Sequence, residues 1–245
     1  MTSGMLVVWI LTTNMPLVML AIWHAVAADG PVGHFDQRAF TTYYLGVLAV
    51  RLLTSNWVVW QLSLEIRDGT LSAKLLRPIH PIYALAADHL SAVPMRAIVI
   101  SPAVVILVYV GWDRLLRHDI WLALVFVASL VGAWLLIFFT MILMGALAFF
   151  VESALGLFEL WLGVHSILSG YLVPLEALPH WARSAADVLP FRFMLGFPVE
   201  ALVGLLSRHD ALWALAAQWG YVVFFGAAAL GVWRVGVRHF SAYGG

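Results

Sequence analysis

Long apolar runs separated by short polar interruptions constrain this chain more than any other feature of its sequence. Several of the runs reach about 20 residues, the length that an α-helix needs to cross a bilayer. Within a membrane every backbone polar group must be satisfied internally, and a helix achieves this inside one segment. A transmembrane β-barrel would show short segments of alternating polarity instead. The pattern therefore predicts an all-α, polytopic membrane protein.

The apolar runs predict six membrane spans in one domain that covers residues 1–245. Ala25-Val26-Ala27 resembles a signal-peptide cleavage site, but no positive residue precedes the first run and the run is long for such a signal, so we favour a retained span. Between the fourth and fifth spans only Glu152 and Ser153 are polar, which predicts a tight reversal. An even number of spans places both termini on one side. The predicted spans are residues 5–28, 41–64, 84–110, 120–150, 156–173 and 211–235.

Composition excludes several classes of function. Only 11% of the residues are charged, against about 25% in a soluble domain. The net charge of zero gives no electrostatic basis for binding nucleic acid. Cysteine is absent, so the chain has no disulfide framework and no thiolate metal site. The sequence also lacks G-x-x-x-x-G-K-[ST], H-E-x-x-H and G-x-S-x-G, so no nucleotide-binding, metalloprotease or serine-hydrolase chemistry is supported.

Residues 65–83 form the longest polar interruption in the first half of the chain. Gly69 can end the preceding helix in a left-handed cap. Thr70 can cap a new helix whose body would run from Leu71 to Leu76. Arg77 precedes a proline and should stop that helix, because a residue before proline avoids helical angles. The segment is therefore predicted to carry a short amphipathic helix between two spans.

This short helix would present an apolar group and a basic group of side chains. We expect the apolar group to fill a groove of a soluble partner while the basic group pairs with its carboxylates. The alternative is a helix that rests among lipid headgroups, its cations facing anionic lipid. The apolar group is Leu71, Leu75 and Leu76, and the basic group is Arg67, Lys74 and Arg77.

Residues 174–210 differ in kind from the rest of the chain. Four of the ten prolines fall here, and the stretches between them are too short to cross a bilayer. The stretches His180–Leu189 and Phe197–Leu206 look amphipathic. They predict interfacial or re-entrant helices that pack against the bundle.

Polar residues inside the predicted spans are candidates for a translocation pathway. Charges at such depth are costly and usually face a cavity or a partner, so Arg51 and Arg96 could line a pathway or pair with Glu159. The alternative is snorkelling to an interface or a static ion pair. Asn56 and His165 are further candidates, but Glu159 and His165 are six residues apart and do not share a helical face. Tryptophans would mainly anchor the interfaces, although some could line a pathway for a flat aromatic or cationic substrate.

Two motifs carry a resemblance to a known family. The first is E-x-R-x-G-T-L followed by L-L-R-P, and the second is G-x-x-x-P-L-x-x-L-P-x-W followed by L-P-F-R-F, a proline and a glycine. With the six-span layout, the chain resembles an ABC-2 type permease, the membrane subunit of ATP-binding-cassette exporters. The motif residues are Glu65, Arg67, Gly69, Thr70, Leu71, Leu75, Leu76, Arg77 and Pro78, and then Gly170, Pro174, Leu175, Leu178, Pro179, Trp181, Leu189, Pro190, Phe191, Arg192, Phe193, Pro198 and Gly204.

The resemblance implies a homodimer or heterodimer of permeases in the inner membrane, each with a cytoplasmic ATPase subunit that holds ATP and Mg²⁺. This chain would then carry no cofactor and no catalytic residue. Residues 65–83 would supply the cytoplasmic coupling helix, the helices after span five an extracellular lid, and spans two and five the dimer seam and the pathway. Hydrophobic or amphipathic molecules would be exported.

The resemblance leaves two points open. Basic residues do not decide the orientation by the positive-inside rule, so cytoplasmic termini rest on the resemblance alone. Similar permeases usually begin with a basic amphipathic helix, whereas only residues 1–4 precede span one here. That helix is expected to be missing, supplied by a partner chain, or lost through a misassigned start.

Two other functions remain as alternatives. Histidines in three spans, His24, His89 and His165, could ligate haem in an intramembrane redox or enzyme subunit. The chain could also be an assembly or anchoring subunit with no pathway of its own, in which case substitution of Arg51 and Arg96 would leave transport unchanged.

Overall fold

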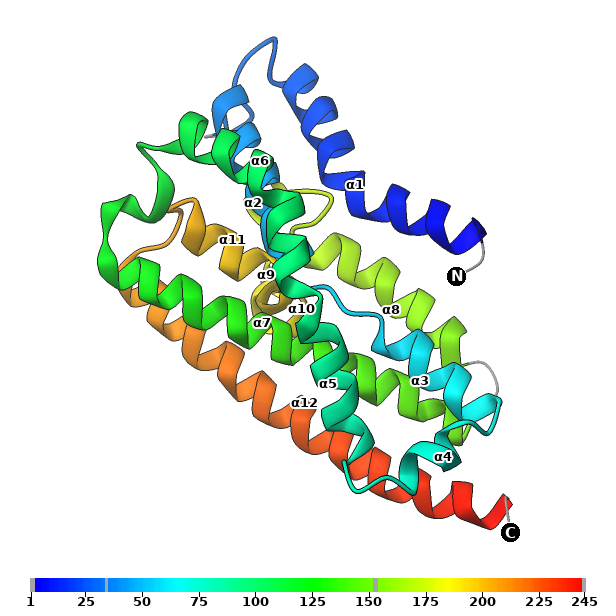
Figure 1. Cartoon of the computed structure of the whole chain (residues 1–245). Helices are drawn as coiled ribbons and strands as arrows, with labels where there is room; N and C mark the ends of the chain where they lie inside the picture. Colours follow the sequence, from blue (N-terminus) through cyan, green and yellow to red (C-terminus); the bar gives the residue numbers. More distant parts are fainter. Residues whose placement is uncertain (1–2, 34, 152–153, 244–245) are drawn as a thin grey trace.

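The computed structural model describes residues 3–33, 35–151 and 154–243, and within these ranges the chain is helical without a β-strand (Figure 1). Val32 and Phe35 form one isolated bridge in a connection. The predicted all-α class is confirmed. The helices are α1 Ser3–Val26, α2 Gln37–Thr54, α3 Val58–Arg67, α4 Leu71–Leu75, α5 Pro81–Ser91, α6 Val93–Gly111, α7 Ile120–Ala146, α8 Ala154–Leu168, α9 His180–Val188, α10 Pro190–Met194, α11 Gly196–Leu202 and α12 Arg208–Tyr243, with 3-10 turns η1 Leu115–His118, η2 Leu147–Phe149 and η3 Leu175–Ala177.

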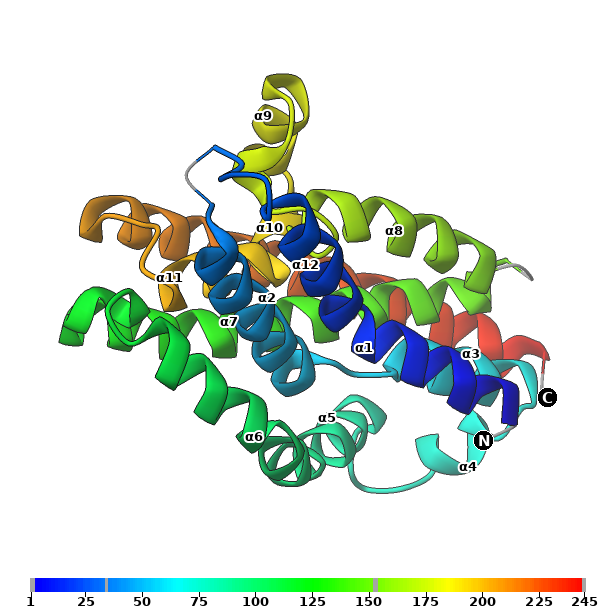
Figure 2. The same ribbon diagram turned by 90° about the horizontal axis from the view of Figure 1, so that it is seen from above.

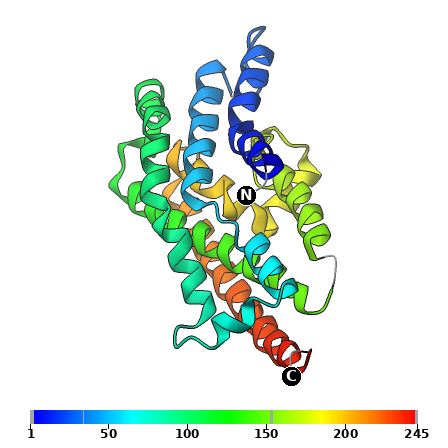
Figure 3. The ribbon, with the colours of Figure 1, turned by 45° about the vertical axis from the view of Figure 1, so that its right-hand side comes forward.

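Helix α7 lies at the centre of the bundle and runs beside α12 along much of its length (Figures 1 and 3). Gly132 of α7 permits this approach, because a Cβ there would lie 2.6 Å from Oε1 of Gln218 on α12. The Gln218 side-chain amide donates to the backbone carbonyls of Ser129 and Phe193, at 2.9 and 2.8 Å. One buried side chain therefore joins α7, α10 and α12.

Among the described residues, four helical stretches are long and apolar enough to cross a membrane, namely Gln37–Arg67, Pro81–Gly111, Ile120–Phe149 and Arg208–Phe240. They coincide with the predicted spans two, three, four and six. The stretches for spans one and five are shorter apolar helices, Asn14–Val26 and Ala154–Leu168. The count of six spans therefore stays a prediction. The reversal expected at Glu152 and Ser153 lies outside the described residues.

The second span is not one continuous helix as the apolar run predicted. Helix α2 ends at Thr54 and α3 begins at Val58, and Ser55 between them is extended with ψ 141°. Arg96 of α6 donates a hydrogen bond to the Ser55 carbonyl, and the Ser55 hydroxyl donates to the Leu52 carbonyl at 3.4 Å. Side chains thus satisfy backbone groups that an interrupted membrane helix frees.

Residues 65–83 contain the short helix that the sequence predicted, α4, which lies at the end of the bundle where α12 ends (Figure 1). Gly69 has φ +73°, which confirms the left-handed cap. The predicted cap by Thr70 is wrong. Thr70 itself has helical angles, and its hydroxyl points back toward the Glu65 carbonyl at 3.5 Å.

The segment after α8 contains α9, α10 and α11, close to the short helices predicted there. Helix α9 projects from the other helices in Figure 2. The expectation of an amphipathic second piece is wrong for α11, because its residues from Gly196 to Ala201 are all buried. Tyr43 and Tyr44 of α2 hold this segment, since their hydroxyls donate to the carbonyls of Gly170 and Leu172 at 2.9 Å. Whether these helices re-enter the membrane stays a prediction.

Three ion pairs join the connection before α2, the connection before α7 and the start of α12, at the end of the bundle away from α4 (Figure 1). Exposed pairs of this kind contribute little to stability individually. They nevertheless hold polar connections together where the apolar helices end. The pairs are Arg38–Asp113 at 3.0 Å, Arg114–Asp36 at 3.2 Å and Arg208–Asp119 at 2.5 Å.

Candidate functional site

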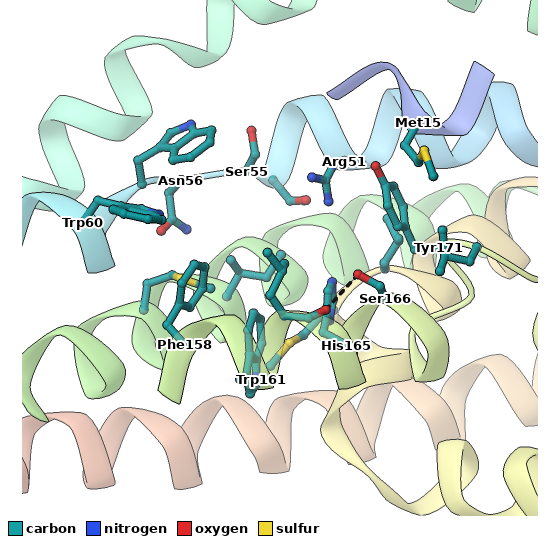
Figure 4. Close-up of a pocket in the computed structure, with 18 residues that line it drawn as sticks. Met15, Arg51, Ser55, Asn56, Trp60, Phe158, Trp161, His165, Ser166 and Tyr171 are labelled. Atoms are coloured by element: carbon teal, nitrogen blue, oxygen red, sulfur yellow. Dashed lines mark hydrogen bonds between the residues drawn. The ribbon is translucent and has the colours of Figure 1, made fainter. Parts of the chain in front are cut away.

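A cavity of about 420 Å³ lies where the break between α2 and α3 faces α7, α8 and α10 (Figure 4). Most of its wall is apolar, with four large rings from the break, α3 and α8. Polar groups enter from α2, the break, α8 and the connection after α8. A mostly apolar cavity with a few convergent polar groups is the usual form of a small-molecule site. The rings are those of Trp57, Trp60, Phe158 and Trp161, and the principal polar side chains are Arg51, Asn56, His165 and Tyr171.

Arg51 lines this cavity from the last turn of α2. Its guanidinium carbon lies 4.4 Å from the centroid of the Tyr171 ring, a cation–π arrangement. Among the described residues, no carboxylate lies within 4.0 Å of this guanidinium. The partial negative charge at the C-terminal end of α2 favours a cation here. The cation is thus held by partial charges and a ring, without a counter-ion.

The other polar groups of the cavity have unused hydrogen-bonding capacity. Asn56 is buried in the break, and neither its amide nitrogen nor its amide oxygen has a partner in the described part of the chain. His165 is also buried, stacks on Trp161 with ring centroids 4.9 Å apart, and leaves its Nδ1 without a partner. Figure 4 shows Arg51 and His165 directed toward the same space, with Asn56 farther along its wall. Three of the five predicted pathway residues therefore lie around one cavity.

The coupling segment divides into buried and exposed parts that its sequence did not distinguish. Leu71 is fully buried in the core with Leu62 and Leu85, and Leu75 packs against that core. The prediction that Leu71 contacts a partner is therefore wrong, because it faces the protein's own core. Leu76 is 89% exposed, which leaves it free for an outside contact.

Two exposed apolar residues next to Leu76 were missed by the sequence analysis. Ile79 is 63% exposed and Tyr83 is 72% exposed. Ile79 lies three residues after Leu76 and Tyr83 four residues after Ile79, a spacing that was visible in the sequence but that Pro78 and Pro81 obscured. Arg67 and Arg77 are exposed in the same segment. We define these five residues, Arg67, Leu76, Arg77, Ile79 and Tyr83, as the coupling patch.

Lys74 is not part of this patch. Its ammonium group lies 2.5 Å from Oε1 of Glu65, and the same oxygen accepts a hydrogen bond from Gln61 at 3.0 Å. Glu65 and Lys74 are both largely shielded from solvent. The pair therefore fixes α4 to the end of α3, so Lys74 serves the chain's own fold, contrary to the prediction that it pairs with a partner's carboxylate.

Comparison with protein-family models matches residues 30–244 to the family described as ABC-2 family transporter protein. This chain belongs to the ABC-2 transporter family. Neither the curated proteins nor the solved structures contain a match to it. The ABC-2 chain is thus a permease, the membrane subunit of an ABC transporter, and such subunits are normally non-catalytic. The family favours transport over the haem-binding alternative.

The remaining predicted pathway residues of this ABC-2 permease lie elsewhere. Arg96 does not line the cavity but braces the break through the Ser55 carbonyl. Glu159 lies on an exposed face of α8. The expected pair between either arginine and Glu159 is absent from the described residues. Arg96 thus acts as a structural brace through a backbone carbonyl, an arrangement that the sequence analysis did not predict.

The second motif of the ABC-2 permease supplies chain reversals and a partial wall for the cavity. Gly170 and Gly204 have φ +83° and +73°, conformations that favour glycine. Pro174, Pro179 and Pro190 stand at the starts of η3, α9 and α10, where a missing backbone N–H costs little.

The rings of this motif face two ways. The Phe191 ring lies 6.2 Å from that of His165, whereas Trp181 on α9 is 75% exposed. Pro198 is buried within α11. The motif therefore packs one ring against His165, a residue of the cavity wall, and leaves another exposed.

Proposed function

We propose that this ABC-2 permease exports a hydrophobic or amphipathic molecule, driven by ATP that a separate cytoplasmic ATPase hydrolyses. The coupling patch carries this proposal. The segment where two membrane-length helices are connected exposes three large apolar side chains and two arginines of this patch. A large exposed apolar group rimmed by charge is typical of a protein contact. The missing phosphate-binding motif requires the ATPase to be another chain.

The anchoring of the coupling segment suits it to transmit force. Leu71 in the core and the Lys74–Glu65 pair attach α4 to α3, and His80 contacts Trp233 of α12 with ring centroids 5.9 Å apart. A force applied to the coupling patch would therefore be transmitted to α3 and α5.

Two interruptions provide places where these helices can bend. Residues 55–57 separate α3 from α2, and Ala92 separates α5 from α6. Interrupted segments of this kind absorb the rotations of a two-state transition that a ligand biases. Because Asn56 and Trp57 also line the cavity, bending at the break would change the cavity's shape. ATP-dependent closure of the ATPase would thereby act on the pathway.

The assembly that we propose contains two permease chains, identical or related, each with one ATPase. Residues 65–83 would face the cytoplasm, with both termini on the same side of the inner membrane. Surrounding lipid would cover the exposed apolar faces of the long helices, among them Ile98, Val105 and Tyr109 on α6.

Leu76→Asp tests the coupling proposal in permease purified with its ATPase. Leu76 is preferred over Leu75, which packs on the core and would disturb folding if charged. Loss of an apolar contact central to an interface costs about 2 kcal/mol or more, so permease-stimulated ATP turnover should fall at least about tenfold. The matched control is Val188→Asp, which charges a 70% exposed aliphatic residue on α9, away from the patch. The control should retain stimulated turnover.

Two outcomes would contradict the proposal. One is unchanged stimulated turnover in Leu76→Asp, with membrane insertion and thermal stability matching the unsubstituted permease. The other is a wild-type permease with which no ATPase co-purifies. A protease-protection map that places the patch outside the cell would refute the orientation.

A further inference from the structure

We propose that the cavity binds an amphipathic anion, with an acidic head group beside Arg51 and a flat aromatic body between the rings of α3 and α8. This inference rests on the proposed function and names the substrate class of the same pathway. Neither the family description nor the motifs specify a substrate. The charge, the unpaired donors and the shape of the cavity supply the argument.

The charge of Arg51 is the first observation that supports an anionic substrate. Arg51 is the only Arg, Lys, Asp or Glu among the described residues that line the cavity. Tyr171 and the end of α2 offer it partial negative charge, and neither is an anion. An isolated cation among apolar side chains within a membrane is costly, and such residues usually face a charged partner or a substrate. A bound carboxylate, sulfonate or phosphate would supply the missing counter-charge and accept two hydrogen bonds from the guanidinium.

The unused hydrogen-bonding groups are the second step. The Asn56 amide and Nδ1 of His165 are buried at the cavity without partners in the described chain. Buried polar groups are normally satisfied, and exceptions of this kind indicate a ligand or a functional role. An amide nitrogen and an imidazole N–H can both donate to the oxygens of an acidic head group. Helix α3 also begins at the cavity without a side-chain cap, and a helix N-terminus favours an anion.

The shape of the cavity provides the third step. Trp60 and Phe158 make an edge-to-face pair with centroids 6.1 Å apart, and Phe158 stacks on Trp161 at an interplanar angle of 22°. These rings extend from the polar groups along the cavity (Figure 4). A flat apolar body can stack on them while its acidic end stays near Arg51. The volume of about 420 Å³ fits one small molecule of this kind.

The aromatic wall alone would also suit a cationic substrate, which the sequence left open. Arg51 makes the difference, because a like charge in a cavity of low dielectric constant repels a cation strongly. The cavity therefore selects anions over cations.

A matched pair of probes tests the charge requirement without the ATPase. The purified full-length permease in nanodiscs of uncharged lipid is titrated with 1-anilinonaphthalene-8-sulfonate and with its neutral parent, N-phenyl-1-naphthylamine. Energy transfer from tryptophan reports occupancy, because three tryptophans line the cavity. Empty nanodiscs supply the background from lipid partitioning. The sulfonate should bind at least about tenfold more tightly than the neutral probe, as one charge-assisted contact implies.

Three substitutions assign the effect to one residue. Arg51→Met should weaken sulfonate binding at least about tenfold and leave the neutral probe within about twofold. Arg51→Lys should recover part of the sulfonate affinity. Arg114→Met removes an arginine that pairs with Asp36 at the surface and does not line the cavity, and it should leave both affinities unchanged. Retained binding of the neutral probe shows that each variant is folded.

Equal affinity for the two probes, or equal loss of sulfonate binding in the Arg51 and Arg114 variants, would overturn the inference. Sulfonate binding that Arg51→Met does not weaken would also overturn it. These results are distinguishable from failure of the proposed function, because probe binding needs no ATPase. Selective anion binding with no coupling at the patch would refute ATP-driven export alone.

Discussion

Two shielded arginines of this permease have opposite surroundings. Arg192, between α9 and α11, contacts the carboxylates of Asp187 and Glu200, with 2.7 Å to Glu200. Arg51 faces a cavity with a tyrosine ring and no carboxylate among the described residues nearby. Arg192 thus has two carboxylate partners, whereas Arg51 has none among the described residues.

This contrast distinguishes Arg192, whose charge stabilises the fold, from Arg51, whose charge has no carboxylate partner. A paired buried charge stabilises its site only as long as both partners are present. Arg51 has no carboxylate partner and is held only by the Tyr171 ring and the partial charge at the end of α2, and charges of this kind within membrane helices usually face a cavity or a partner. Arg192 therefore holds α10 and α11 in place, and Arg51 is available to a ligand.

The largest expected effect is on stability. Arg192→Met leaves Glu200, whose side chain is 7% exposed, without its cation. Breaking a buried pair from one side costs about 3–5 kcal/mol, so the unfolding temperature should fall markedly. Arg51→Met removes an unpaired cation and should leave the unfolding temperature unchanged or raise it. Thermal unfolding in detergent, followed by tryptophan fluorescence, compares the two variants. An equal fall in unfolding temperature in the two variants would contradict the proposed difference between the two arginines.

A carboxylate placed in the cavity should make Arg51 resemble Arg192. Asn56→Asp preserves the size of the side chain and offers Arg51 a counter-charge across the cavity. Affinity for the anilinonaphthalene sulfonate should then fall about tenfold, or about 1.4 kcal/mol, while the neutral probe binds as before. The same titrations in nanodiscs measure this effect. Undiminished sulfonate affinity would mean that the head group binds elsewhere.

The smallest effect is expected for a third arginine, Arg114, which pairs with Asp36 at the surface. The backbone N–H of Ala39 and the Arg114 guanidinium hold the pKa of Asp36 below its ordinary value, although burial opposes them. The charged form therefore stabilises the fold above the ordinary pKa, and this contribution is lost as pH falls through the lowered one. Because the pair is exposed, acidification below about pH 4 should cost less than about 1 kcal/mol through this group.

Asp36→Asn tests the origin of that pH dependence. Asparagine caps a helix about as well as aspartate, so α2 should keep its start while the titrating charge disappears. The difference in unfolding free energy between the two proteins should shrink on going from neutral to acidic pH. A difference that stays constant with pH would show that Asp36 does not contribute through its charge.

Local signals in the sequence were sufficient for the class of the protein and for the position of the short helix α4. The backbone of a long apolar run can form its hydrogen bonds inside a membrane by folding into a helix, whatever that helix packs against. Gly69 determined the reversal before α4, because a positive φ favours glycine wherever it occurs. The motifs predicted the family, which the match over residues 30–244 confirmed.

Tertiary packing decided what each polar or apolar residue does. The residues near Ser55 in the sequence do not predict that the helix ends there, because the hydrogen bond to the Ser55 carbonyl comes from Arg96 on another helix. Leu71 and Leu76 look alike in the sequence, and only the position of the core buries one and exposes the other. Arg51 and Arg192 likewise differ in which distant side chains reach them, Tyr171 in one case and Glu200 in the other. Hydropathy and glycine act on their own segment, whereas burial and charge pairing depend on residues that only the fold brings together.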